Sequence, residues 1–362
     1  MFFNQRERDP MERSSLEFLR KLVETPSPSG FEQPAQKLIR ERMRDAVDEL
    51  RTDAHGNVIG VKNPKAPLRV MLAGHCDEIG MMITHVEDKG YLYFAQIGGI
   101  DAAILQAQRV EIHSRRGRVE GVIGRKAIHL MEAEERGKPA KIKDCWIDIG
   151  AKDKKDALKA VEIGDPITIS RRFVEMRNGL VAARGFDDRV GAWTVVETMR
   201  RIRNLKLKCA VYGVSTVQEE LGLRGARTAA FGIEPHAGIA IDVGFATDYP
   251  DADKKALGEV ALGKGPILHR GANINPVLAT LMERAAKKRR IPFQMQAAPG
   301  ATGTDANAIQ INRAGAAAAL VGIPNRYMHT PVEVVSLTDL TRAVDLLVAV
   351  LSDLKPSQSF IP

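Results

Sequence analysis

The chain has 362 residues, of which 44% are hydrophobic and 27% are charged, and its formal net charge is +8. That much apolar sequence can build one large domain or two ordinary ones, each with a sizeable core. There is no run of 18 or more apolar residues, and the first residues are polar and mixed in charge. We therefore expect neither a membrane span nor a signal peptide, and a cytoplasmic protein fits this pattern best.

The segment that precedes residue 76 has the pattern of an α/β unit. Apolar residues recur at helical spacing between about Glu32 and Val47, which predicts an amphipathic helix. Two apolar runs follow, VIGVK at 58–62 and LRVMLAG at 68–74. Both runs are typical of buried strands.

The stretch from about residue 77 to 172 consists of short alternating runs separated by glycine turns, such as QRVEIHSRRGRVEGVIGRK. This pattern is typical of a small β-barrel or sandwich. We therefore predict an α/β domain formed by residues 1–76 and 173–362, with a β-domain of residues 77–172 inserted into it.

The α/β pattern resumes after residue 173. The apolar spacing predicts helices at 188–202, 223–231, 276–288 and 337–354 and strands at 208–217, 237–243, 292–298 and 316–323. Strands that alternate with helices in this way favour a mostly parallel sheet covered by helices on both faces.

Polar side chains with metal-binding or catalytic chemistry lie where five of these segments begin or end. They are His75 and Asp77, Asp187 and Asp188, Glu219 and Glu220, Asp242, and His329. Each alone has an ordinary structural explanation, such as a helix cap or a turn histidine. The carboxyl ends of parallel strands meet at one edge of a sheet, however, so these side chains are expected to converge. Their combined negative charge would then need a cation.

Two divalent cations would balance this charge and supply a reaction. Imidazole and carboxylate groups suit zinc, cobalt or manganese, and a pair of such ions about 3.5 Å apart activates water and polarises a carbonyl. Adjacent side chains on a strand point in opposite directions, so Glu219 and Glu220 need a bend to serve one site. One of them would then bind metal while the other addresses the water. The pattern predicts metal-dependent hydrolysis.

Six motifs of the sequence resemble those of the M42 metallo-aminopeptidases, the TET-type enzymes also labelled glutamyl aminopeptidase or cellulase M. In chain order they are GHCDEIG, GFDDRVG, VQEELGLRGA, IDVG, TGTDA and RYMHTPVEV. The resemblance covers nearly the whole chain. It implies a zinc-exopeptidase-like fold whose inserted β-domain serves dimerisation, dimers that assemble into a dodecamer, and removal of N-terminal residues from short peptides.

Carried onto this sequence, the resemblance implies five ligands for two metal ions, one general base and one residue that orients a ligand. The ligands are Asp187, which bridges the two ions, His75 and Asp242 at one ion, and Glu220 and His329 at the other. Glu219 would be the base, and Asp77 would orient the imidazole of His75. Zinc or cobalt would be the ions, with manganese as a further option.

Other functions stay open at this point. A glycoside hydrolase would use two carboxyl groups about 5 to 9.5 Å apart and no histidine. A metal-dependent hydrolase of a non-peptide N-acyl substrate would use the same ligands. A non-catalytic, metal-stabilised particle would lack a ligand or the base, and here all are present.

Several further residues have competing interpretations. Thr304 and Asp305 either cap the helix that follows them or line the substrate pocket. Cys76 is expected to be a buried filler that points away from the site, and the odd, widely spaced cysteines predict reduced thiols. The histidines outside the motifs, with His269 the least certain, are read as structural. Basic clusters such as AKKRR at 286–290 alternate with acidic residues and do not predict a nucleic-acid partner.

Overall fold

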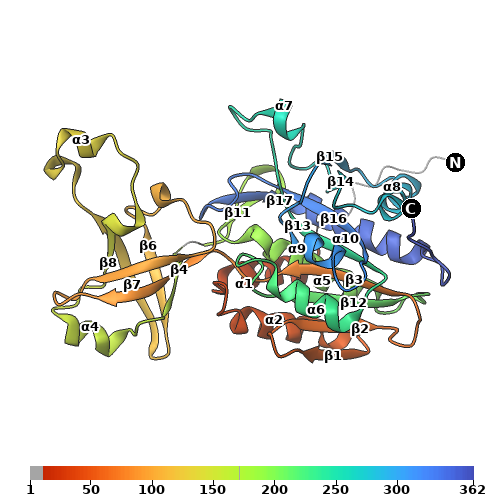
Figure 1. The fold of residues 1–362 in the computed structure, drawn as a ribbon, viewed down its shortest axis with the longest axis horizontal. Helices are drawn as coiled ribbons and strands as arrows, with labels where there is room; N and C mark the ends of the chain where they lie inside the picture. The colour runs from red at the N-terminus through yellow and green to blue at the C-terminus, as the bar shows by residue number, and fades with distance from the viewer. Residues whose placement is uncertain (1–10, 171) are drawn as a thin grey trace.

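The protein consists of an α/β part and a β-barrel that stands beside it (Figure 1). The computed structural model describes residues 11–170 and 172–362; the first ten residues, for which the sequence predicts no signal peptide, lie outside the described residues. Within the described residues no helix is both long and apolar enough to cross a membrane.

An eight-stranded sheet lies at the centre of the α/β part, in the order β1-β2-β12-β3-β13-β16-β14-β15. The bounds are β1 (Glu49–Thr52), β2 (Val58–Lys62), β3 (Arg69–His75), β12 (Ala210–Thr216), β13 (Ala237–Phe245), β14 (Ile267–Gly271), β15 (Gln294–Ala298) and β16 (Ala317–Asn325). The four central strands β12, β3, β13 and β16 run parallel to one another. The predicted mostly parallel sheet is confirmed, although β1 and β14 were not predicted.

Helices cover both faces of this sheet, as predicted. On one face lie α1 (Arg13–Glu24), α2 (Gln33–Met43), α5 (Phe186–Ile202), α8 (Pro276–Lys288) and α10 (Leu337–Asp353), and on the other α6 (Arg224–Ile233) and α9 (Asp305–Gln310). The predicted helix from about Glu32 ends earlier than expected, at Met43, and continues only as a short 3₁₀ turn. Helix α1 was not predicted.

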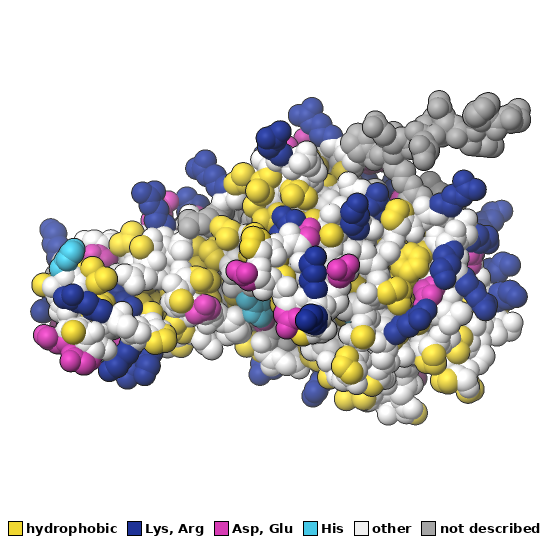
Figure 2. All heavy atoms as spheres, turned by 90° about the horizontal axis from the view of Figure 1, so that it is seen from above, with side chains coloured by type: hydrophobic (Ala, Val, Ile, Leu, Met, Phe, Trp, Pro, Cys, Tyr) yellow, Lys and Arg dark blue, Asp and Glu magenta, His cyan; other side chains and the backbone are white. Residues whose placement is uncertain are grey.

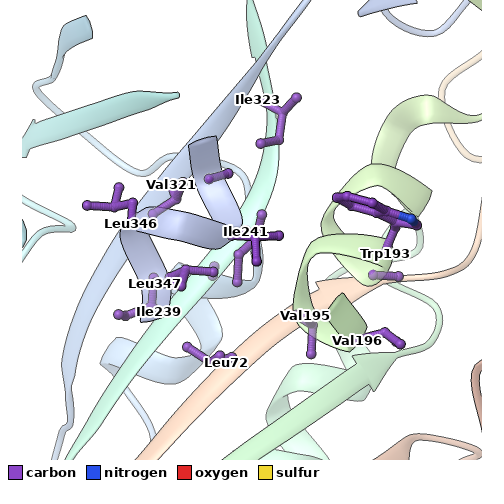
Figure 3. Close-up of a cluster of buried hydrophobic side chains, with 14 of the residues drawn as sticks. Leu72, Trp193, Val195, Val196, Ile239, Ile241, Val321, Ile323, Leu346 and Leu347 are labelled. Carbon is purple, nitrogen blue, oxygen red and sulfur yellow. The ribbon is translucent and has the colours of Figure 1, made fainter. Parts of the chain in front are cut away.

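The larger core lies between the sheet and helices α5 and α10. Figure 3 shows side chains of β13 and β16, among them Ile241 and Ile323, facing those of the two helices, such as Leu347. The strands β13 and β16 are buried along nearly their whole length because each is covered on both faces. Trp193 of α5 is buried, and its indole nitrogen donates a hydrogen bond to the backbone oxygen of Ser15 at 3.0 Å.

The β-barrel is closed and has the strand order β4-β5-β8-β7-β6-β9. Its strands are β4 (Gly80–Val86), β5 (Leu92–Ile97), β6 (Arg109–Ser114), β7 (Gly117–Arg125), β8 (Cys145–Asp148) and β9 (Pro166–Ile169), and its connections carry α3 (Ala133–Arg136) and α4 (Lys154–Ala160). Alternate residues point inward and form a separate core that includes Ile112, Ile147 and Ile167. Of the two predicted architectures, barrel or sandwich, the barrel is the one found.

A small third sheet joins distant parts of the chain. It has the order β10-β11-β17 and consists of β10 (Val174–Glu175), β11 (Leu180–Ala183) and β17 (Glu333–Ser336). Ala183 pairs with Glu333, so the start of α5 lies close to the segment that follows β16. A short helix, α7 (Lys254–Leu257), lies between β13 and β14.

The basic residues are spread over the surface. On the face shown in Figure 2, Lys and Arg side chains are scattered among acidic and uncharged ones and do not form one continuous field. Within the cluster at 286–290, Arg289 and Lys288 both contact Asp353, at 2.7 and 3.2 Å. This is the distribution expected of solvated helix faces.

Candidate metal centre

Six of the side chains singled out in the sequence meet at the carboxyl edge of the large sheet and form two clusters. The first cluster consists of His75, Glu219 and Asp242, and the second cluster consists of Asp187, Glu220 and His329. Within each cluster the candidate ligand atoms lie within 4.8 Å of one another.

The elements that carry these residues explain why they converge. His75 is the last residue of β3, Asp242 lies in β13, Glu219 follows β12 and His329 follows β16. Because these four strands are parallel neighbours, their carboxyl ends open at the same edge. Asp187 reaches the same place from the first turn of α5, where its backbone departs from helical geometry.

Asp187 stands between the two clusters. Its Oδ1 lies 3.3 Å from Nε2 of His75, and its Oδ2 lies 3.1 Å from Nε2 of His329. Nδ1 of His329 donates a hydrogen bond to the backbone oxygen of Gly99 at 2.8 Å, which orients the ring so that Nε2 faces Asp187. One carboxylate thus offers one oxygen to each imidazole.

Asp77 lies behind the clusters and contacts three of their members. Its Oδ1 accepts the backbone N–H of Glu219 at 3.1 Å and lies 3.4 Å from Nδ1 of His75. Its Oδ2 accepts the backbone N–H of Glu220 at 3.2 Å and the hydroxyl of Ser29 at 2.7 Å. The side chain is fully buried. One carboxylate therefore holds the bend on which the two adjacent glutamates lie.

The buried negative charge of the two clusters favours a bound cation. Burial raises the pKa of Asp242 and of Glu219, and neighbouring carboxylates raise both further. Burial by itself lowers the pKa of His75, but the attraction of Glu219 and the other carboxylates outweighs it and raises the pKa well above the usual value. The clusters hold more carboxylates than imidazoles.

The donor set fits a divalent cation in each cluster. Oε1 of Glu220 is buried and has no hydrogen-bond partner among the described residues, although it lies 3.6 Å from Nε2 of His329. A buried carboxylate oxygen without a donor is costly. Imidazole nitrogen and carboxylate oxygen are donors that zinc, cobalt and manganese accept.

Two further buried carboxylates hold the backbone of this centre, and the sequence analysis gave neither a role. Glu333 accepts the backbone N–H of Asp187 at 3.1 Å and that of His329 at 3.0 Å. Asp188 accepts the backbone N–H of His75 at 3.1 Å. Asp188 and Glu333 both lie inside the motifs quoted above. Glu333 also interrupts an apolar run, and this pattern could have identified it as a candidate in the sequence.

The structure places three residues whose roles the sequence left open, Thr304, Asp305 and Cys76. Thr304 caps α9 by accepting the backbone N–H of Ala306, and it also lines the cavity described next. Asp305 does not cap; it is buried and accepts the hydroxyl of Thr216 at 2.6 Å. Cys76 is buried in the large apolar core, and all three cysteines are free thiols, as predicted.

A cavity of about 680 Å³ opens beside the two clusters. It extends from the clusters along the ends of β13, β14 and β15 and is bounded by the loop at 299–304 and by Met328. His269, which the sequence analysis left outside the motifs, lines it. The centre is therefore accessible to a ligand.

The comparisons with known proteins agree over nearly the whole chain. The M42 glutamyl aminopeptidase family matches residues 56–346. A lysyl aminopeptidase of Pyrococcus furiosus is 38% identical over 94% of this chain and 97% of its own length.

Comparison with solved structures leads to the same family. A TET aminopeptidase of a marine Thaumarchaeota archaeon superposes with a TM-score of 0.91 at 34% identity, over 94% of this chain and 97% of that one. A TET1 peptidase of Pyrococcus horikoshii, described as able to assemble into a tetrahedron or a large octahedral shell, superposes with a TM-score of 0.85 at 31% identity, over 94% of this chain and 100% of that one. This chain belongs to the M42 family of aminopeptidases and is a peptide hydrolase.

Proposed function

We propose that the protein is a dinuclear metal-dependent aminopeptidase that removes the N-terminal residue from short peptides. The observation that carries this proposal is the position of Asp187, whose two oxygens face the imidazoles of the two clusters. A shared carboxylate of this kind is suited to bridge two metal ions. The imidazoles favour this function over a glycoside hydrolase, which needs carboxyl groups alone.

The proposed ligands follow from the clusters. Asp187 would bridge the ions, His75 and Asp242 would complete the first site, and Glu220 and His329 would complete the second. Two divalent ions, zinc or cobalt foremost and manganese as the further option, would lower the pKa of a bound water to roughly 7 and polarise the scissile carbonyl.

Glu219 is the proposed general base. Its Oε2 lies 3.7 Å from Nε2 of His75, beside the proposed ligands rather than behind them. Burial raises the pKa of Glu219, which suits a carboxylate that must take a proton from water and release it again. The proton passes from the water to Glu219 and then to the leaving amine nitrogen. Asp77 keeps the imidazole of His75 and the backbone of Glu219 in place.

A preference for a free N-terminus is also part of this proposal. A free α-amino group would bind at the cluster of metal ions and carboxylates, whereas the nitrogen of an acetylated N-terminus is an amide and a far weaker ligand. The enzyme is therefore proposed to cut at the N-terminal residue and not within a chain.

The assembly, the domain division and the location are proposed from the relatives and the fold. We infer that the chain forms dimers through the inserted β-domain of residues 77–172 and that these assemble into a dodecamer. The relative from Pyrococcus horikoshii supports this proposal through its closed shells. A cytoplasmic location agrees with the composition and with the reduced thiols.

Chelation is expected to abolish hydrolysis of short peptides, and cobalt, zinc or manganese is expected to restore it. The reason is that the proposed nucleophile forms only on bound metal. The measurement is release of the N-terminal residue from one peptide before and after dialysis against a chelator, with the N-acetylated peptide as a control that should stay intact. Full activity of a metal-free sample, or cleavage of the acetylated peptide, contradicts the proposal.

A further inference from the structure

The cavity beside the clusters has no fixed charge of its own. Its lining includes the six side chains of the two clusters, but none of its other lining residues is Asp, Glu, Lys or Arg. Its walls carry apolar side chains, among them Leu320, Met328 and Phe245, and small residues such as Ala297. Beyond the metal ligands and Glu219, a charged substrate side chain would therefore find no partner of opposite charge there.

The polar groups of this cavity are already engaged within the protein. Nε2 of His269 contacts Oε1 of Gln296 at 3.2 Å, and the amide nitrogen of Gln296 donates to the backbone oxygen of Leu257 at 2.7 Å. Because Gln296 presents its oxygen to the ring, Nε2 of His269 is the donor of this contact. Nδ1 of His269 lies 3.4 Å from the backbone oxygen of Leu320, and burial lowers the pKa of the ring.

We infer that this cavity takes the N-terminal side chain of the substrate and selects uncharged, mainly apolar residues such as leucine and methionine. The inference rests on the aminopeptidase function proposed above and names its substrate class. Burying an ammonium or carboxylate beside Leu320 and His269 costs free energy that no opposite charge on these walls returns. An apolar side chain gains from leaving water at the same wall.

The test is hydrolysis of amino-acid anilides by the metal-loaded protein. The leucyl and methionyl anilides are expected to have a kcat/KM at least tenfold above the lysyl, arginyl, glutamyl and aspartyl anilides. A lysyl or glutamyl anilide as the best substrate overturns the inference while leaving the aminopeptidase function intact. If the protein hydrolyses none of the anilides, the proposed aminopeptidase function is contradicted, and the inferred substrate class is contradicted with it.

A matched pair of variants tests whether the absence of charge is the cause. Ala297 is exposed and lines the cavity. Ala297→Asp and Ala297→Asn introduce side chains of the same shape that differ in charge. Ala297→Asp is expected to raise the ratio of lysyl to leucyl kcat/KM several-fold above that of Ala297→Asn. Equal ratios for the two variants would show that charge in this cavity does not set the preference.

A second, independent observation concerns Glu333. Its side chain is 1% exposed, and its two oxygens accept the backbone N–H groups of Asp187 and His329 at 3.1 and 3.0 Å. Among the described residues, its contacts with Asp187 and His329 are made to their backbones, so its effect passes through those backbones. His329 has φ 60°, a left-handed conformation that non-glycine residues seldom adopt.

We propose that Glu333 is a positioning residue for the second metal ion. Two members of the second cluster, Asp187 and His329, come from segments more than a hundred residues apart. Among the residues that the structure describes, Glu333 is the side chain whose two oxygens tie the backbones of both, so it fixes how the two segments lie relative to each other. His75 and Asp242 of the first site have no such contact with Glu333 among the described residues.

Glu333→Gln is expected to weaken binding of the second metal ion about 10- to 100-fold, with a smaller effect on the first. The amide nitrogen would face one of the two backbone N–H donors, so one of the two hydrogen bonds is lost. The measurement is titration of the metal-free protein with zinc or cobalt by calorimetry, with bound metal counted by elemental analysis. The expected result is one tightly bound ion per subunit where the wild type binds two.

Asp339→Asn is the matched control. Asp339 is fully buried and accepts two backbone N–H groups, of Gly263 at 2.6 Å and Gly265 at 2.7 Å, in a loop outside the clusters. This variant should bind both ions as the wild type does. If Glu333→Gln does not fold, Glu333→Asp, which shortens the reach but keeps the charge, carries the same expectation. Two ions bound with wild-type affinity, or an equal loss at both sites, overturns the proposal.

Discussion

Glu219→Gln is expected to lower turnover by roughly 10² to 10⁴-fold while both metal ions stay bound. The amide keeps the shape of the side chain but cannot accept the proton of the attacking water. The backbone N–H of Glu219 remains held by Asp77 at 3.1 Å, so the bend itself should not move. The measurement is kcat for a leucyl anilide together with the number of metal ions per subunit.

Glu220→Gln is the comparison for this prediction. The buried Oε1 of Glu220 has no hydrogen-bond partner among the described residues, as expected of a ligand oxygen. A neutral amide is a weaker donor to a divalent cation, so this variant should lose metal from the second site and regain activity when excess metal is added. If Glu219→Gln loses metal and Glu220→Gln keeps both ions but not turnover, the two assignments are reversed.

Gly74→Ala is expected to destabilise the protein by at least about 1–3 kcal/mol and to lower turnover with it. A Cβ at this position would lie 2.4 Å from the backbone carbon of Gly191 and 2.6 Å from the backbone nitrogen of Ala192. These are backbone atoms, so no side chain can rotate out of the way. Strand β3 and helix α5 would have to separate, and they carry His75 and Asp187.

Chemical unfolding of the metal-free protein measures this effect without the contribution of bound metal. Gly232→Ala is a suitable control, because it lies in α6 and a Cβ there would meet nothing within 4 Å. That variant should be about as stable as the wild type or slightly more so. Equal stability of Gly74→Ala and the wild type would mean that the strand and helix do not pack as closely as described.

Much of the architecture could be predicted from local pattern. The central strands β3, β12, β13 and β16 were expected because continuous apolar runs of their length suit strands buried on both faces. The strands β1 and β17, which were not predicted, lack such a pattern. β1 is mostly exposed, and β17 is short and contains the charged Glu333. β1 pairs with the neighbouring β2, whereas the strand conformation of β17 depends on pairing with the distant β11.

The sequence by itself determined which residues form the centre. Charged and imidazole groups placed where apolar strands end must meet when those strands are parallel, so His75, Glu220, Asp242 and His329 could be named before any coordinates. The order of the motifs was also sufficient to identify the family. The prediction of these residues succeeds because it needs only the period of the strands and the chemistry of the side chains.

Only the tertiary structure decided how the centre is held and what lies beside it. That Asp187 faces both imidazoles depends on where α5 packs against β3. That Glu333 ties Asp187 to His329 depends on the pairing of β11 with β17, two segments about 150 residues apart. The uncharged cavity around His269 likewise arises where β13, β14 and β15 end together. Contacts between distant segments follow from the packing of the whole chain. The local sequence pattern determines which face of an element is buried, but it does not determine which other element packs against that face.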